Sequence, residues 1–310
     1  MGAYIVRRLL QGTIVVFIVS LITFFTLQAA PGDPIEQMLG EGAVQMTQED
    51  LDRIRDKWGL NDPWYQQYFT WIGNLATLDF GVSIVRIGTP ARDMILDAAP
   101  VTLKLNAMAL LTAIAIALPL GMLAAIKRYS FFDSAIMVFA SIGISVPSFW
   151  AGLMGIVFFA GSLGWVPSNG TGTWKHWILP VAVLALTEVA ILARLMRGAM
   201  LEVLSQDYMT TARAKGLAER LVVVRHALRN ALLPVITVIG YRAAFLLSGT
   251  VVIETIFALP GLGRLFFQSV FRFDYQVVQG IVLTFTLLVV FANIITDLFY
   301  GLIDPRIRLR

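Results

Sequence analysis

The sequence predicts an all-α, polytopic membrane protein with six transmembrane helices, and three observations lead to that fold class. Hydrophobic residues make up 57% of the 310 residues, charged residues only 14%, and the mean hydropathy is +0.75. Soluble domains have roughly 45–50% apolar and about 25% charged residues. The apolar residues also fall into long runs with few or no charged residues, which is the pattern that crossing a bilayer requires.

Six runs are long enough to cross the hydrocarbon core, which takes about 20 helical residues. They are 9–32, 105–126, 134–160, 177–197, 231–253 and 277–300. The first has 24 uncharged residues after Arg7 and Arg8. It exceeds the roughly 7–15 apolar residues of a cleavable signal peptide, so we expect it to be retained. Pro119 and Pro147 lie inside the second and third runs, where neighbouring helices can satisfy the freed carbonyls.

Residues 31–98 differ from the rest because they contain eleven acidic and five basic residues. We expect a small extracytoplasmic helical excursion here. Thr47 suits the N-cap of a first short helix and Gly59 suits its end. Pro63 suits the first turn of a second helix, whose residues 64–72 are amphipathic and rich in aromatic side chains. This excursion is either a cap that packs on the membrane face of the protein or a docking surface for a substrate-delivery partner.

The expected organisation is a first transmembrane helix (1–30), the excursion (31–98) and a core of five further spans (99–310). Six spans place both termini on one side of the membrane. Fourteen basic residues fall on that side, among them those of the loop 207–234, and nine fall on the other. Cytoplasmic loops carry the excess of Lys and Arg, so the termini and this loop are expected in the cytoplasm.

Several kinds of chemistry lack their usual sequence patterns. Cysteine is absent, and the two histidines, His176 and His226, lie too far apart for a metal-site spacing. None of the five lysines follows a glycine, so the chain has no P-loop for a nucleotide. Neither G-x-S-x-G nor H-E-x-x-H occurs. We therefore expect no enzyme activity, no metal and no cofactor in this chain, and the small net charge of +4 does not indicate nucleic acid binding.

The loop 207–234 is basic and helix-prone, and here the sequence resembles a known family. Asp207–Leu217 reads DYMTTARAKGL and His226–Pro234 reads HALRNALLP. These stretches resemble the EAA loop of ABC-importer permeases, and more narrowly the B-type permease subunit of the dipeptide, oligopeptide and nickel import family. The resemblance extends over nearly the whole chain and includes PGDP at 31–34, DFGVS at 79–83, SVPSFW at 145–150, PGLGR at 260–264 and DPRIR at 304–308.

The resemblance implies a membrane subunit that does not work alone. Its partners would be a second, homologous permease, two cytoplasmic ATPase subunits (or one as a homodimer) and an extracytoplasmic solute-binding protein. ATP and Mg would be bound by the ATPase subunits, and the chain would lie in the bacterial inner membrane. The translocated solute would be a peptide, with nickel, an opine, glutathione or another small solute as the alternative.

The resemblance also implies that the loop couples the permease to the ATPases. The residues in that role would be Thr210, Thr211, Ala212, Arg213, Lys215, Gly216, Leu217, Arg220, Leu221 and Val224. The residue types suit it, because Gly216 permits a tight turn between two short helices. The basic side chains of the set can meet an acidic surface. Its leucines and valine are three to four residues apart and offer an apolar stripe.

Two departures favour the peptide branch of the family. The acidic residue that names the EAA motif is absent, and Thr210, Thr211 and Ala212 stand there instead. The separation of Gly216 from Pro234 is 18 residues, longer than in the broad importer pattern. The first departure leaves open whether Thr210 contributes to coupling.

Two charged residues, Glu188 and Arg242, lie far from the ends of their predicted spans. Glu188 is nine residues before Arg197, about 13 Å along a helix, and Arg242 is 13 residues after Arg229, about 19 Å along the next. Their depths are similar, so they can pair. Intramembrane ionisable groups usually face a cavity or a partner. Glu188 and Arg242 therefore either lie close to the translocation pathway or form a purely structural ion pair.

Two function hypotheses of other classes compete with the importer. A stand-alone secondary transporter or channel predicts inverted repeats and an ion pathway of its own, and the sequence shows neither. An intramembrane hydrolase predicts a Ser/His or metal constellation, which is likewise not visible. The function expected from the residues and the resemblance is thus half of a translocation pathway powered by partner ATPases.

Overall fold

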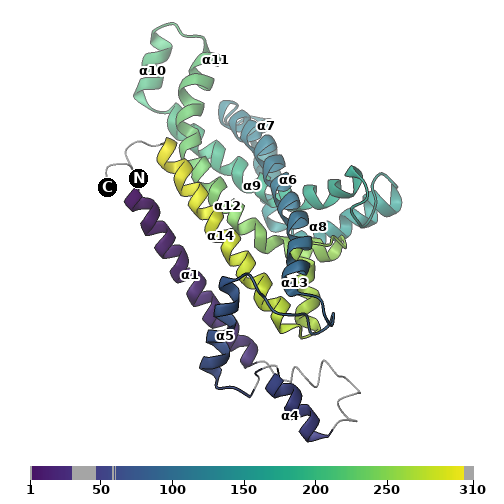
Figure 1. Cartoon of the computed structure of the whole chain (residues 1–310). Coiled ribbons are helices and arrows are strands. Elements are labelled where there is room, and N and C mark those ends of the chain that lie inside the picture. The colour runs from purple at the N-terminus through teal and green to yellow at the C-terminus, as the bar shows by residue number, and fades with distance from the viewer. Residues whose placement is uncertain (1, 30–46, 58, 60, 304–310) are drawn as a thin grey trace. The chain divides into compact units, whose positions relative to one another are not determined.

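The computed structural model describes residues 2–29, 47–57, 59 and 61–303, and these are mainly helical (Figure 1). Within that part of the chain, the extended structure is limited to an isolated bridge between Val82 and Pro90. The chain divides into two compact units. The large unit comprises Thr102–Leu259 and the chain from Val289 onward, and the small unit comprises Gly2–Val101 and Pro260–Leu288.

The small unit is built on the first helix and the excursion. Its helices are α1 (Gly2–Gln28), α4 (Gln48–Lys57), α5 (Trp64–Ala76), α13 (Leu262–Phe271) and the first parts of α6 (Ala91–Ile126) and α14 (Tyr275–Ile303). The aromatic face of α5 packs on the end of α1, where the Phe24 and Tyr68 rings meet edge to face at 5.4 Å. A hydrogen bond of 2.9 Å joins the hydroxyls of Ser20 and Tyr68. The α5 face that carries Tyr68 is thus packed against α1. This agrees with the interpretation of the excursion as a packed cap, for that face of α5.

The sequence signals of the excursion correspond to real helix ends. The Thr47 hydroxyl accepts a 3.3 Å hydrogen bond from the Asp50 N–H at the start of α4, and Gly59 has a positive φ of +66° two residues after α4 ends. Pro63 lies directly before α5 rather than in its first turn, with an extended ψ of 141°. The rigid φ of proline thus sets the direction in which the chain enters α5.

The large unit is arranged around α9 (Ile178–Leu204). This helix packs against α7 (Phe131–Ser145), α8 (Ser148–Gly155) and α12 (Leu228–Ile256). Its apolar stretch is 61% buried, the highest fraction of the five helices that meet the criteria for a membrane span. Small residues allow neighbours to come close: a Cβ on Gly143 of α7 would lie 3.1 Å from the Ala190 Cβ. Close approach of backbones at small residues is typical of helices packed in a membrane.

Five of the described helices are long and apolar enough to cross a membrane, and a bent pair of helices forms either a broken sixth span or a re-entrant loop. The five are Val6–Gln28, Ala91–Ile126, Trp174–Leu204, Glu219–Leu247 and Tyr275–Thr296. The predicted run 134–160 is not one helix, because Phe131–Ser145 and Ser148–Ser162 meet at an angle of 100°. Val146 and Pro147 are both extended at the break, with ψ of 120° and 135°. A proline disfavours helical backbone in the residue before it, so the helix ends there.

The span predicted to begin at Leu105 belongs to a longer helix. α6 begins at Ala91, because Ala91, Met94, Ile95 and Ala98 are buried in a core with Leu262, Val277 and Ile281 of the small unit. The charged residues before Leu105, from Arg92 to Lys104, therefore lie within the helix and do not mark its start. Farther along it, the Lys104 ammonium lies 4.4 Å from the centre of the Trp177 ring within the large unit. The ring face offers a favourable cation–π contact.

Gly121 provides a test of the packing of α6 on α9. A Cβ at this position would lie 2.5 Å from the Ala193 carbonyl oxygen and 2.7 Å from the Met196 Cβ. Gly121→Ala should therefore destabilise the protein by about 1–3 kcal/mol through overpacking, despite the better helix propensity of alanine. The measurement is the thermal stability of the detergent-solubilised protein, read from monodisperse recovery after heating.

The matched control is Gly198→Ala on α9, where a Cβ would meet nothing within 4 Å. This variant gains the same helix propensity without a clash, so its stability should be unchanged or raised. Equal stability of the two variants would contradict the close approach of α6 to α9 at Gly121.

Candidate functional site

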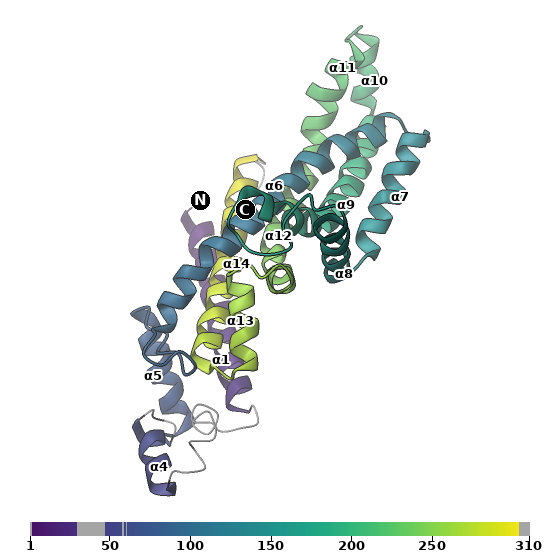
Figure 2. The ribbon, with the colours of Figure 1, turned by 90° about the vertical axis from the view of Figure 1, so that its right-hand side faces the viewer.

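The loop that the sequence singled out forms a helical hairpin in the large unit. α10 (Asp207–Ala214) is followed by a turn and then by α11 (Glu219–Leu221), which continues through a π-helical segment, η3 (Val222–Ala227), into α12. Both views show α10 and α11 side by side at one end of this unit (Figures 1 and 2). We refer to Asp207–Ala227 as the hairpin.

Gly216 makes the turn of the hairpin possible. Its φ is +76°, a conformation that glycine adopts without strain, and its N–H donates to the Arg213 carbonyl at 2.9 Å. A Cβ at this position would meet nothing within 4 Å. The requirement for glycine is therefore conformational rather than steric, as expected for the end of a short helix.

The inner face of the hairpin is rooted in the core of the large unit. Met209 of α10 and Val222 of η3 are fully buried, in one cluster with Met196 and Met200 of α9. Two residues expected in the coupling set belong to this inner face: Ala212 is 8% exposed and Leu217 packs against the same cluster. Their side chains thus hold the hairpin on α9 and are turned toward the core.

The outer face of the hairpin carries the remaining residues of the predicted set. Leu221 and Val224 are 42% and 50% exposed. The predicted apolar stripe is therefore divided, with Leu217 turned inward and the other two turned outward. The exposed polar members are Thr210, Thr211, Arg213, Lys215 and Arg220.

An ion pair closes the hairpin across its turn. Arg213 donates from Nε and Nη2 to the two carboxylate oxygens of Glu219, at 3.1 and 3.0 Å. Donating these hydrogen bonds to the carboxylate raises the pKa of the Arg213 guanidinium, which therefore stays charged. Exposed pairs contribute only about 0–1 kcal/mol, so this one orients the turn more than it stabilises the fold. Lys215 and Arg220 then supply the exposed positive charge near the turn.

The two predicted intramembrane charges meet between α9 and α12. Arg242 donates from Nε to Glu188 Oε2 at 2.7 Å and from Nη2 to Oε1 at 2.5 Å. The side chains are only 14% and 5% exposed. Such a two-pronged arrangement is the strong form of an arginine–carboxylate interaction. The similar depth inferred from the sequence therefore corresponds to a direct pair.

The exposed side of this pair is aromatic. The Arg242 guanidinium lies 4.7 Å from the centre of the Phe245 ring, and the Tyr241 and Phe245 rings stack at 6.4 Å. Both rings are more than half exposed, at 62% and 52%. Phe245 thus lies over a guanidinium on an outward face of α12. A face of this kind is available to a second subunit or to a solute path.

A second buried ion pair on α9 was not found by the sequence argument. Arg197 donates to both carboxylate oxygens of Asp133 in the first turn of α7, at 2.6 and 2.8 Å. Asp133 also accepts from the Tyr129 N–H at 3.0 Å, and Ser130 caps the helix by accepting from the Asp133 N–H at 3.3 Å. In the sequence analysis Arg197 was one of the fourteen basic residues assigned to the cytoplasmic side, and its pairing with Asp133 was not predicted. The sequence signal was a lone acid three residues after a serine at a helix start.

Comparison with known proteins gives the family of the chain. The profile of the family described as binding-protein-dependent transport system inner membrane component matches residues 117–309, and that of its N-terminal part matches residues 1–106. The oligopeptide transport system permease protein AppB of Bacillus subtilis is 42% identical over 317 residues, which cover 99% of each chain. The di/tripeptide transport system permease protein DppB of Pseudomonas aeruginosa is 42% identical over 339 residues, again 99% of each chain.

Solved structures share the fold at low sequence identity. A chain of the MetNI methionine ABC transporter, in an inward-facing conformation, aligns with a TM-score of 0.58 and 19% identity, covering 68% of this chain and 96% of its own. A chain of an amino acid ABC transporter crystallised with histidines aligns with a TM-score of 0.52 and 16% identity, covering 67% and 93%. These alignments agree with the helical membrane fold described above.

A double-mutant cycle tests whether the Glu188–Arg242 pair is structural. Glu188→Gln or Arg242→Gln alone leaves a buried charge without its partner, which typically costs about 3–5 kcal/mol. Each single variant should therefore lose thermal stability and transport. The double variant should recover much of both, because no net charge remains buried and two amides can still bond.

The decisive measurement is the range of solutes taken up by the double variant. An unchanged range together with recovered transport is expected for a structural pair. Recovered stability without transport would instead place the two charges in the solute path.

Proposed function

Because this chain belongs to the family of binding-protein-dependent transport system inner membrane components, we propose that it forms half of the translocation pathway of an ATP-driven peptide importer. The names of its relatives support the peptide class, since AppB is described as an oligopeptide permease and DppB as a di/tripeptide permease. The helical membrane fold supports the role of a membrane subunit. The chain itself is then not an enzyme.

The proposal includes three kinds of protein partner. A second, related permease supplies the other half of the pathway. A solute-binding protein delivers the peptide, and the words 'binding-protein-dependent' in the family's description support that partner. Two ATPase subunits, or one as a homodimer, bind ATP and Mg, because no lysine of this sequence stands in a P-loop. Neither nucleic acid nor a metal or cofactor of its own enters the scheme.

One observation carries the coupling part of the proposal: the hairpin is buried on one face and exposed on the other. Its inner face is held on α9 through Met209 and Val222, while Leu221 and Val224 are exposed. Exposed apolar side chains beside Lys215 and Arg220 suit a protein interface with a polar rim. We assign this outer face to the ATPase subunits.

The hairpin is suited to transmit movement because it is rigidly attached. A push on its outer face acts through the buried cluster on α9, and from α9 through the Glu188–Arg242 pair on α12. Packed helices respond to such a push as rigid bodies rather than by gradual deformation. ATP-driven closure of the ATPase pair would then switch the two permeases between inward-facing and outward-facing states.

The cytoplasmic location of the hairpin and termini remains part of the proposal. It rests on the positive-inside rule applied to the loop charges. Arg197 is neutralised by Asp133, so one of the fourteen basic residues on the side of the termini no longer counts toward the rule. The other basic residues of that side still outnumber those of the opposite side, thirteen to nine. ATPase subunits need cytoplasmic ATP, so the same orientation follows from the proposed partners.

Gly216 allows the coupling role to be tested. Gly216→Val should abolish coupling, because a β-branched residue at φ +76° is strained and would reshape the turn. We expect substrate-stimulated ATP hydrolysis of the assembled transporter to fall about tenfold or more, as a strain of about 1–3 kcal/mol allows. The amount of permease in the membrane should stay constant.

Gly216→Asn is the matched control, since asparagine tolerates the left-handed conformation and nothing obstructs its Cβ. It should keep stimulated hydrolysis close to the unsubstituted level. Normal stimulation in Gly216→Val would remove the hairpin from the coupling role.

Reconstitution tests the class of transporter. Vesicles with this chain alone should show no peptide flux, and flux should require the second permease, the ATPases, the binding protein and ATP. Flux through the chain alone would indicate a stand-alone secondary transporter or channel. Competition of labelled peptide uptake by nickel, opines or glutathione would identify a non-peptide cargo, and we expect unlabelled short peptides to compete best.

A further inference from the structure

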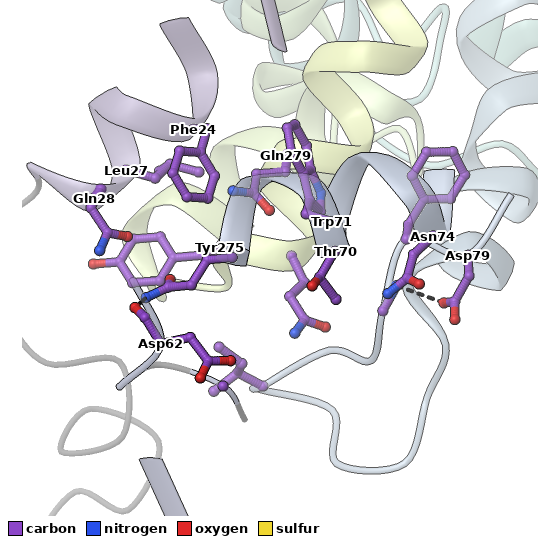
Figure 3. A pocket seen from close by; sticks show the side chains of 16 residues that line it. Phe24, Leu27, Gln28, Asp62, Thr70, Trp71, Asn74, Asp79, Tyr275 and Gln279 are labelled. Carbon is purple, nitrogen blue, oxygen red and sulfur yellow. Dashed lines mark hydrogen bonds between the residues drawn. The ribbon is translucent and has the colours of Figure 1, made fainter. Parts of the chain in front are cut away.

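The small unit contains a pocket that no proposed role above uses. Its volume is about 250 Å³, and it is lined by the end of α1, by α5, by the segment 79–84 and by the start of α14 (Figure 3). These parts all belong to the small unit. Each lies in or next to the predicted extracytoplasmic excursion, on the side where a solute would arrive.

The polar side chains of the pocket form a rim and a floor. The rim residues Asp62, Thr70 and Asp79 are exposed, whereas Trp71 and Gln276 are half-buried. Among the described residues that line the pocket, none is Lys, Arg or His. The two carboxylates therefore make the pocket negative, which disfavours anions and favours a cationic group.

Two buried polar atoms of the floor lack a hydrogen-bond partner in the described part of the chain. They are the Trp71 indole Nε1, which is a donor, and the Gln276 Oε1, which is an acceptor. Leaving such groups unpaired costs about 1–3 kcal/mol each, so most buried polar atoms in proteins are paired. A ligand that both accepts and donates a hydrogen bond would satisfy the two at once.

The backbone around the pocket is organised to keep Gln276 in place. Gly81 has a φ of +79°, and a Cβ on it would collide with the Gln276 side-chain amide. The segment that carries Gly81 is fixed to the start of α14 by Asp274, which is 2% exposed. Its carboxylate accepts from the Ser83 hydroxyl at 2.5 Å and from the Ile84 N–H at 3.1 Å. The acceptor at Gln276 is thus part of a built site rather than of a loose surface.

The size and lining of the pocket indicate its ligand. Pockets for drug-sized molecules measure about 300–1,000 Å³, so this one fits only a small group. An adjacent amide C=O and N–H would match the unpaired Trp71 and Gln276 atoms. Phe24 and Leu27 supply apolar walls for a side chain. An ammonium group would complement the carboxylates.

We propose that this pocket binds the amino-terminal end of a short peptide. The α-ammonium group faces Asp62, a peptide carbonyl accepts from Trp71 Nε1–H, and a peptide N–H donates to Gln276 Oε1. The permease would thereby hold the end of a peptide itself, in addition to the solute-binding protein. This inference rests on the proposed peptide importer and adds a binding site to it.

The test is titration of the assembled transporter, without its solute-binding protein, with trialanine and with Nα-acetyl-trialanine. Calorimetry of the nanodisc-embedded complex should show binding of trialanine, and about tenfold weaker binding of the acetylated peptide, because acetylation removes the charge. Asp62→Asn should weaken trialanine binding and abolish most of the preference over the acetylated form. Trp71→Phe should weaken both peptides by a similar factor, about fivefold to tenfold, because only a hydrogen bond is lost.

Two matched controls lie outside the pocket. Trp165→Phe removes an indole that is 64% exposed in the large unit, and Asp97→Asn removes an exposed carboxylate from α6 within the small unit. Neither should change the affinity for trialanine. All variants should keep the elution profile and thermal stability of the unsubstituted complex.

The inference would be overturned by the absence of trialanine binding, by equal binding of the acetylated peptide, or by binding that Asp62→Asn and Trp71→Phe leave unchanged. Weaker docking of the solute-binding protein with unchanged peptide binding would also overturn it, since a protein segment would then occupy the pocket. Stimulation of ATP hydrolysis by the loaded binding protein serves as the separate test of the importer. If stimulation is present and the pocket does not bind peptide, only this inference fails.

Discussion

The large unit depends on the packing of α9, a helix buried on most of its apolar stretch. In a bilayer the lipid is as apolar as the helix surface, so close contact, rather than escape from water, must hold helices together. α9 achieves that contact at small residues: Gly121 of α6 and Gly143 of α7 lie directly against it. Its C-terminal end, with Met196 and Met200, also forms the seat of the hairpin. The element that organises the core is therefore the one on which the candidate coupling surface rests.

Two bidentate ion pairs secure the same helix at different levels. Glu188 binds Arg242 of α12, and Arg197 binds Asp133 of α7, each with little exposure of the carboxylate. Buried pairs add little net stability, but a charge left without its partner is costly. The pairs therefore discourage α9 from sliding past either neighbour while leaving joint movement possible. A hairpin fixed to such a group of helices can transmit displacement without deforming, as the proposed coupling requires.

The small unit uses the same chemistry to build a site rather than to hold helices. The buried Asp274 fixes the loop that contains Gly81, and Gly81 leaves space for the Gln276 amide. Gln276 lines the same pocket as Trp71, whose indole nitrogen lacks a hydrogen-bond partner in the described part of the chain. Such a polar cluster is costly unless something completes its hydrogen bonds. The proposed peptide site and the proposed coupling surface belong to different units, and each has its own framework. Delivery of the solute and use of ATP are thus assigned to separate parts of one chain.

Local features of this protein followed from the sequence by itself, because they depend on neighbouring residues. The apolar runs predicted the spans, Thr47 the start of α4 and Gly216 the turn of the hairpin. The similar depths of Glu188 and Arg242 along their helices made a pair possible, and the structure shows that it forms. Tertiary structure alone decided the partner of Arg197, which is 64 residues away, the burial of Ala212 and the packing of the partly buried Leu217 on the core. The 100° bend at Pro147 and the pocket around Trp71 were likewise decided in three dimensions. Hydropathy and helical period specify which segments are helices and which face is apolar, but not which distant side chain each will meet.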